Sequence, residues 1–134
     1  HKPEVVMCLD PFRSKSHTHR DHRISGQVTV DAAFTYAWRR HHFSEHVTED
    51  GLEPHLAKEI YLWGSEEPDT FVDVSETLEL KLQTLLKHAS QITDPERARQ
   101  WIPTGAQRMG ERAHLDYAEG FRVIRFVPDL LLME

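Results

Sequence analysis

The residues of this chain best suited to chemistry lie in one short segment, Ser16–Arg23. Three histidines and a carboxylate fall within six positions there, as His17, His19, Asp21 and His22. Zinc sites use neutral imidazole ligands whose second nitrogen is oriented by a carboxylate or a carbonyl, so the segment offers both parts. By spacing alone, a polar histidine-rich loop is a better interpretation than a metal site. The choice between the two depends on the elements around the segment.

The segment follows a predicted strand. Residues 3–9 form a near-continuous apolar run, which is typical of a strand covered on both faces, as in a parallel sheet. Asp10 stands at the carboxyl end of this strand, where open α/β sheets place their ligand crevices. Residues 12–20 then form a polar loop, and loops at such a place often carry function.

A long helix is predicted from about His22 to Arg40, with Asp21 as its N-cap. Apolar residues recur along it at helical spacing, and we expect them to pack in the core. They are Ile24, Val28, Ala32 and Tyr36, with Phe34, Ala37 and Trp38 beside them. A second strand is predicted over residues 58–63. Strand, helix and strand make one βαβ unit, which predicts an α/β fold with a mostly parallel sheet.

The second half of the chain is predicted to hold two helices between short strands. An extended piece over residues 71–74 precedes a helix capped by Ser75, and this helix ends in a polar turn at His88. A histidine is favoured at a helix C-terminus, which explains His88 without any chemistry. Asp94 with Pro95 starts the next helix, which we expect Pro103 to interrupt. A last strand is predicted from Phe121.

Composition limits the classes of protein to consider. A chain of 134 residues is the size of one domain, and 39% hydrophobic residues is typical of a globular protein. The net charge of −6, with basic residues dispersed among acidic ones, argues against a nucleic-acid surface. No apolar run is long enough to span a bilayer. With Cys8 as its one cysteine the chain has no internal disulfide framework, and we expect a cytoplasmic protein.

Five segments in a fixed order carry a resemblance to a known family. They are Pro3–Val6 with Asp10–Pro11, His19–Arg23, Glu59–Trp63, His88–Gln91 and Tyr117–Arg122. In this order they resemble the LmbE-like, or PIG-L, zinc-dependent N-deacetylases over nearly the whole chain. The resemblance implies a Rossmann-like, three-layer α/β fold and the hydrolysis of acetamido groups on sugars or sugar-containing molecules.

The same resemblance implies roles for individual residues. His22 would be a ligand of zinc or another divalent metal, and His19 would stabilise or protonate the tetrahedral intermediate. Asp21 would orient a histidine through a carboxylate–imidazole hydrogen bond. His17 and His88 are candidates for contacts with the substrate at the edge of the site. The expected partner is a small N-acetylated sugar or conjugate, and a homo-oligomer is compatible with the sequence.

One motif of the family has no counterpart in this chain. The other zinc ligands and the general base of the family come from an Ala-His-Pro-Asp-Asp-Glu type motif near the amino terminus, and nothing like it occurs here. A catalytic zinc needs three protein ligands and an open position for water, and His17 and Asp10 are poor substitutes. We therefore expect the carboxyl-terminal half of a deacetylase, without its first strands and inactive by itself.

Three alternatives stay open at the level of sequence. The chain could be a degenerate deacetylase half that binds a partner or a sugar without catalysis. It could be a hydrolase with Cys8 as nucleophile and His19 or His22 as base, although a cysteine in mid-strand is poorly placed for attack. It could hold a structural zinc, although such sites normally have four ligands, commonly cysteines. The deacetylase and the degenerate half both predict an exposed apolar strip where the first strands should pack.

Overall fold

The computed structural model describes residues 1–15 and 19–126, which form two compact units. Of these, residues 1–15, 19–69 and 121–126 belong to the first unit, and residues 70–120 form the second. The elements of the first are β1 (Val5–Leu9), α1 (Arg20–Asp31), η1 (Ala32–Tyr36), α2 (Ser44–Thr48) and β2 (Glu59–Trp63). Those of the second are β3 (Thr70–Asp73), α3 (Leu78–Leu86) and α4 (Pro95–Glu111), and β4 (Ala118–Arg125) begins there and ends in the first.

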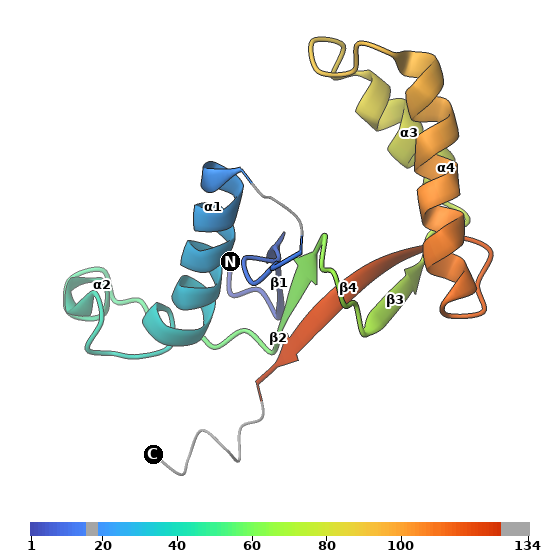
Figure 1. The fold of residues 1–134 in the computed structure, drawn as a ribbon. Helices are drawn as coiled ribbons and strands as arrows, with labels where there is room; N and C mark the ends of the chain where they lie inside the picture. The colour runs from blue at the N-terminus through green and yellow to red at the C-terminus, as the bar shows by residue number, and fades with distance from the viewer. Residues whose placement is uncertain (16–18, 127–134) are drawn as a thin grey trace. The chain divides into compact units, whose positions relative to one another are not determined.

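The four strands form one sheet in the order β1-β2-β4-β3 (Figure 1). The β1–β2 pair is parallel, with Leu9 opposite Trp63, as the predicted βαβ unit requires. The β2–β4 pair is antiparallel, with Glu59 opposite Arg125. The α/β class is therefore confirmed. The sheet is mixed, and the predicted parallel pairing is found between β1 and β2.

The core of the first unit lies between this sheet and the helical segment that follows β1. It contains the buried residues Cys8, Ala33, Ile60 and Leu62, with Val6, Val30, Ile124 and Phe126 packed against them. Side chains alternate along a strand, so Val6 and Cys8 share the covered face of β1, while Val5 and Met7 lie 45% and 57% exposed on the other. The prediction that β1 is covered on both faces is therefore wrong within this chain.

The helix after β1 differs from the prediction in its bounds and in the face it buries. It begins at Arg20 with His19 at the N-cap, so Asp21 lies in the first turn and is not the cap. It gives way at Ala32 to the π-helical turn η1, in which the amide of Ala37 donates to the carbonyl of Ala32. Its buried residue is Gly26, whereas Val28 of the predicted core stripe is 58% exposed.

Gly26 explains which face α1 buries. A Cβ at this position would lie 2.4 Å from the carbonyl oxygen of Leu9 and 3.3 Å from Pro11. No side chain fits at such a distance, so glycine lets the helix approach the end of β1 closely. The apolar stripe predicted for the core lies beside this contact face. Six of its seven members are at least one-third exposed, namely Ile24, Val28, Ala32, Phe34, Tyr36 and Ala37.

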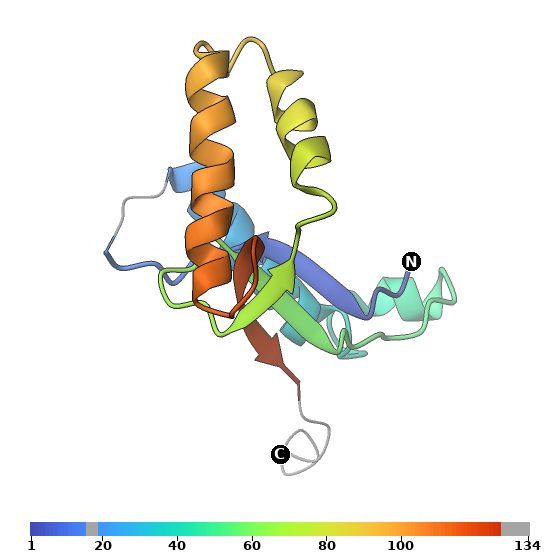
Figure 2. The same cartoon turned by 90° about the vertical axis from the view of Figure 1, so that its right-hand side faces the viewer.

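In the second unit, α3 and α4 run side by side (Figure 2). Leu82 of α3 and Ala98 and Ala106 of α4 are buried, which confirms the predicted apolar face of α3 at its centre. Among residues 1–15 and 19–126, no helix combines the length and the apolar character that a membrane span needs.

The ends of these helices test the capping predictions. The Asp94 side chain accepts a hydrogen bond from the amide of Arg97, and Pro95 is the first helical residue, as predicted. The predicted cap Ser75 lies before α3 and donates through its amide and its hydroxyl to Asp73 instead. The predicted break at Pro103 is also wrong, because α4 continues through it to Glu111.

Candidate functional site

The candidate site lies where β1 and β2 end side by side. The amide of Asp10 donates to the carbonyl of Trp63 at 3.0 Å, which extends the parallel pairing one residue past β1. The Asp10 side chain is 3% exposed, and its Oδ1 accepts a hydrogen bond from the amide of Phe12 at 2.9 Å. This carboxylate thus closes the turn that takes the chain out of the strand.

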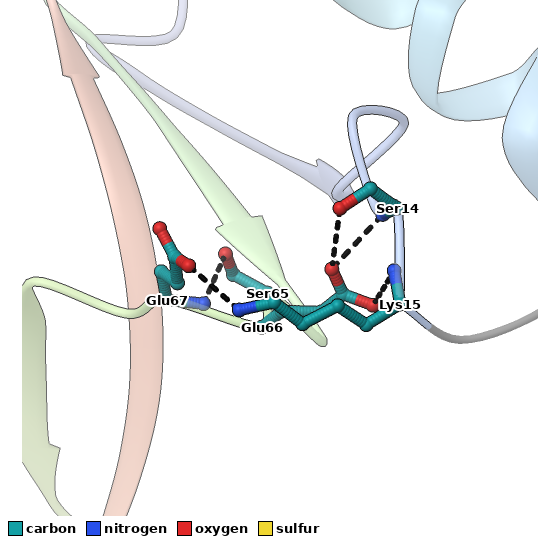
Figure 3. A network of polar contacts seen from close by, with 5 residues as sticks. All are labelled: Ser14, Lys15, Ser65, Glu66 and Glu67. Carbon is teal, nitrogen blue, oxygen red and sulfur yellow. Dashed lines mark hydrogen bonds and ion pairs between the residues drawn. The ribbon is translucent and has the colours of Figure 1, made fainter.

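A network of polar contacts joins the loop after β1 to the loop after β2 (Figure 3). The Glu66 carboxylate accepts hydrogen bonds from the Ser14 amide at 2.9 Å, the Ser14 hydroxyl at 3.3 Å and the Lys15 amide at 2.7 Å. Lys15 Nζ forms an ion pair with Glu67 at 2.8 Å. Gly64, at φ +70°, makes the turn that brings both glutamates to the first loop.

A small polar cavity of about 80 Å³ lies at this edge of the sheet. It is lined by Asp10, Phe12, Arg13, Ser14, Ser65, Glu66, Glu67 and Arg122. The Lys15 ammonium lowers the pKa of Glu67 by its hydrogen bond and its charge, and the Arg122 guanidinium adds to this effect. The carboxyl edge of the two parallel strands therefore carries charges of both signs within hydrogen-bond reach of each other.

The predicted catalytic residues come together at the first turn of α1. The rings of His19 and His22 meet edge to face, with centroids 5.5 Å apart. The Asp21 Oδ2 lies 3.9 Å from His22 Nε2, close enough for an ion pair and too far for a hydrogen bond. The side chains of His22 and Asp21 are 53% and 81% exposed. The catalytic and metal-binding roles of these residues stay predictions.

The donor types at this turn suit zinc, but the described residues do not complete a site. Imidazole nitrogens and a carboxylate are ordinary zinc ligands. Within residues 1–15 and 19–126, no three side chains of His, Cys, Asp or Glu gather as a metal would require. His17, a candidate for substrate contact, lies outside the described residues. A catalytic zinc at His22 would therefore take further ligands from elsewhere.

His88, the other candidate for substrate contact, belongs to the second unit and lies just after α3. Its amide donates to the carbonyl of Leu85 at 3.0 Å, and its own carbonyl accepts from the amides of Gln91 and Ile92. The residue is exposed. These bonds form the end of a helix, as the sequence indicated, and the substrate role of His88 stays a prediction.

The surroundings of Cys8 argue against its use as a nucleophile. The side chain is 6% exposed, and its Sγ lies 3.8 Å from the carbonyl oxygen of Gly26. Burial raises the pKa of the thiol, and the nearby charge of Asp10 raises it further. Since the thiolate is the reactive form, a buried thiol with a raised pKa is a core residue.

Two residues of the site were not identified from the sequence. Glu66 stands in an acidic loop, and its sequence neighbours give no sign that it binds the loop after β1. Gly26 interrupts an otherwise helical pattern, and an isolated glycine in a helix can mark a close backbone approach. That signal was present, and it would have identified the contact face of α1.

The fold and the site define a class of protein. The chain has the mixed α/β fold of LmbE-like deacetylases. It is 30% identical to diacetylchitobiose deacetylase of Thermococcus kodakarensis over 133 residues, which is 98% of this chain and 48% of that protein. The chain therefore spans about half the length of the curated relative it matches. No protein-family model matches the chain.

Solved structures agree with this assignment of the fold. N,N'-diacetylchitobiose deacetylase from Pyrococcus horikoshii superimposes with a TM-score of 0.81 at 28% identity, covering 92% of this chain and 46% of that one. The conserved protein TT1542 from Thermus thermophilus has a TM-score of 0.69 at 22% identity, covering 94% and 55%. These similarities support the deacetylase-type α/β fold of this chain.

A further structure shows that this fold is shared by a different kind of enzyme. GalB, the 4-carboxy-2-hydroxymuconate hydratase from Pseudomonas putida, has a TM-score of 0.61 at 16% identity, with 94% of this chain and 54% of that one covered. Because one fold can carry different chemistries, the fold alone does not assign a reaction to this chain.

Proposed function

We propose that this chain supplies part of the active site of a zinc-dependent N-deacetylase that acts on an N-acetylated amino sugar or its conjugate. The observation that carries the proposal is the similarity to a deacetylase over 98% of the chain. The position of His19, Asp21 and His22 supports it. They lie at the start of α1, and Gly26, about 6 Å further along the helix axis, contacts the end of β1.

In this proposal each residue of the first helical turn has its own task. His22 holds the zinc ion, with Asp21 as the carboxylate that orients an imidazole. Bound zinc supplies polarisation of the acetamide carbonyl and a lowered pKa of water. His19, whose ring lies beside that of His22, donates a hydrogen bond to the developing oxyanion or a proton to the leaving amine.

The remaining zinc ligands and the general base are proposed to come from outside this chain. The described residues gather no group of three metal-binding side chains, and the chain spans about half the length of its relatives. A carboxylate from the other half would take the proton of the attacking water. His17 and His88 are proposed to contact the sugar at the edge of the site.

The second candidate function is a non-catalytic module of deacetylase fold that binds a sugar or a partner. The lack of a three-ligand group among the described residues favours it. It differs from the first candidate in one respect that can be measured. A module without catalysis binds the acetylated sugar and releases no acetate.

The test is an acetate-release assay with N,N'-diacetylchitobiose and N-acetylglucosamine, together with metal analysis of the protein. We expect zinc in the purified protein, loss of acetate release after chelation, and its return on addition of zinc. The 134-residue segment assayed alone is expected to be inactive. Sugar binding with no acetate release at any metal loading would contradict the deacetylase and support the module.

A further inference from the structure

The Glu66 carboxylate binds the main chain of the loop that leads to the candidate site. Its Oε2 accepts from the amide and the hydroxyl of Ser14, and its Oε1 accepts from the amide of Lys15 at 2.7 Å. Hydrogen bonds from amides to a carboxylate are charge-assisted and stronger than bonds between neutral groups. Glu66 thus uses both oxygens to hold one short stretch of backbone (Figure 3).

This stretch is the last described part of the loop before the candidate residues. His19 follows Lys15 by four positions. On the strand side, the Asp10 amide is bonded to Trp63, and on the helix side Gly26 packs on the carbonyl of Leu9. The described residues on either side of positions 16–18 are therefore held at three points, at Asp10, at Ser14 and Lys15 through Glu66, and at Gly26.

The neighbouring Glu67 makes a contact of a different kind. It pairs with Lys15 Nζ, at the end of a long side chain, and the two side chains are 79% and 69% exposed. An exposed pair of this type contributes little to local order. Glu66 is half-buried and binds backbone groups, so it limits where the chain itself can go.

We propose that Glu66 is a positioning residue, which holds the backbone of Ser14 and Lys15 ahead of α1 and so fixes the imidazoles of His19 and His22. The proposal rests on the proposed function, because the positioned groups are its zinc ligand and its proton donor. A misplacement of about 1 Å at a reacting group can lower a rate by about a hundredfold, so a bond to the loop can affect chemistry at a distance.

The first experiment measures loop order without reference to activity. Amide hydrogen exchange is compared between the protein and Glu66→Gln, with Glu67→Gln as the matched control. A glutamine keeps one acceptor oxygen and turns its NH2 group toward an amide donor, so at least one bond is lost. We expect the amides of Ser14 and Lys15, which donate to Glu66, to exchange about tenfold faster in Glu66→Gln and at an unchanged rate in Glu67→Gln.

The second experiment asks whether that order matters for the site. Zinc affinity is measured by competition with a chelator, and kcat and KM for acetate release are measured on the same variants. We expect Glu66→Gln to lower zinc affinity and kcat each by about tenfold or more, with a smaller change in KM. Glu66→Asp keeps the charge and shortens the reach, and we expect it to fall between the two.

The outcomes separate the inference from the proposed function. Unchanged exchange in Glu66→Gln overturns the positioning role, whatever the activity of the protein. Faster exchange with unchanged zinc affinity and kcat also overturns it, because the ordered loop would then not serve the site. A wild-type protein that binds zinc without releasing acetate overturns the deacetylase only, and the zinc affinity of Glu66→Gln then decides the inference.

Discussion

Two surfaces of the first unit differ in how far their side chains find partners within the chain. At the carboxyl edge of β1 and β2, the polar groups of two loops bind one another through Glu66, Lys15 and Glu67. Beside α1, apolar residues from β1, α1 and the segment before β2 line an open groove of about 330 Å³. It is lined by Pro3, Val6, Val28, Thr29, Ala32, Ala33, Ala37, His55 and Ala57.

The polar edge is held by contacts within the chain, whereas the apolar groove is open to solvent. Polar loops that bind one another need nothing more to keep their geometry. Val28, which lines the groove, is 58% exposed, so most of its apolar surface stays in water. That a missing part of the fold covers an apolar strip stays a prediction.

The largest effect is expected at the polar edge, from His22→Ala. If His22 holds the zinc, its loss should lower kcat for acetate release by about a thousandfold. The free energy of unfolding should change by less than about 0.5 kcal/mol, because the side chain is 53% exposed. Full activity in His22→Ala would remove His22 from the site, and His41→Ala, an exposed histidine elsewhere, serves as the control.

The contrast between core and groove can be measured with two truncations. Leu62 is fully buried, and Leu62→Ala should lower the free energy of unfolding by about 2–5 kcal/mol. Val28→Ala should cost less than about 0.5 kcal/mol if the groove stays open in the protein. A cost above about 1 kcal/mol at Val28 in urea unfolding would show that something covers the groove.

The contact between α1 and β1 is tested by Gly26→Ala. The added Cβ would lie 2.4 Å from the Leu9 carbonyl oxygen, which is backbone and cannot move aside cheaply. We expect a loss of about 1–3 kcal/mol in the free energy of unfolding, although alanine favours helices more than glycine. Gly105→Ala is the matched control, because nothing lies within 4 Å of its Cβ, and it should not destabilise α4.

The smallest effect concerns pH, at a histidine outside the site. A hydrogen bond to the Asp50 carboxylate at 2.9 Å raises the pKa of His46 above its ordinary value of 6.5, against a weaker desolvation effect. Its contribution to stability is therefore complete below about pH 6.5 and is lost as the pH rises through the folded-state pKa. Asp50→Asn should return the His46 titration, followed by NMR, toward 6.5; an unchanged midpoint would contradict the pair.

Much of the fold could be predicted from the sequence where local signals agree with the tertiary structure. The apolar runs placed β1 and β2 to within two residues at their starts, and Asp94 with Pro95 indicated the start of α4. Ser75 failed as a cap because the Asp73 carboxylate before it captures its amide and hydroxyl. Pro103 failed as a break because α4 is long enough to continue past one missing amide bond.

The adjacency of the two candidate histidines could be predicted from the sequence, and the contacts of Glu66 could not. His19 and His22 are adjacent because they lie one helical turn apart, which the sequence implies once the helix is placed. The bonds from Glu66 to Ser14 and Lys15 join positions about fifty residues apart, and no local pattern encodes such a pairing. The burial of Gly26 in place of Val28 likewise depends on how closely helix and strand approach.

The close contact at Gly26 also has a consequence for how the family of such sequences can vary. An α-helix turns by about 100° for each residue, so inserting or deleting one residue between His22 and Gly26 would swing the imidazole to another side of the axis. The number of residues between His22 and Gly26, which is three, is therefore constrained by the helix geometry more strongly than their side-chain types.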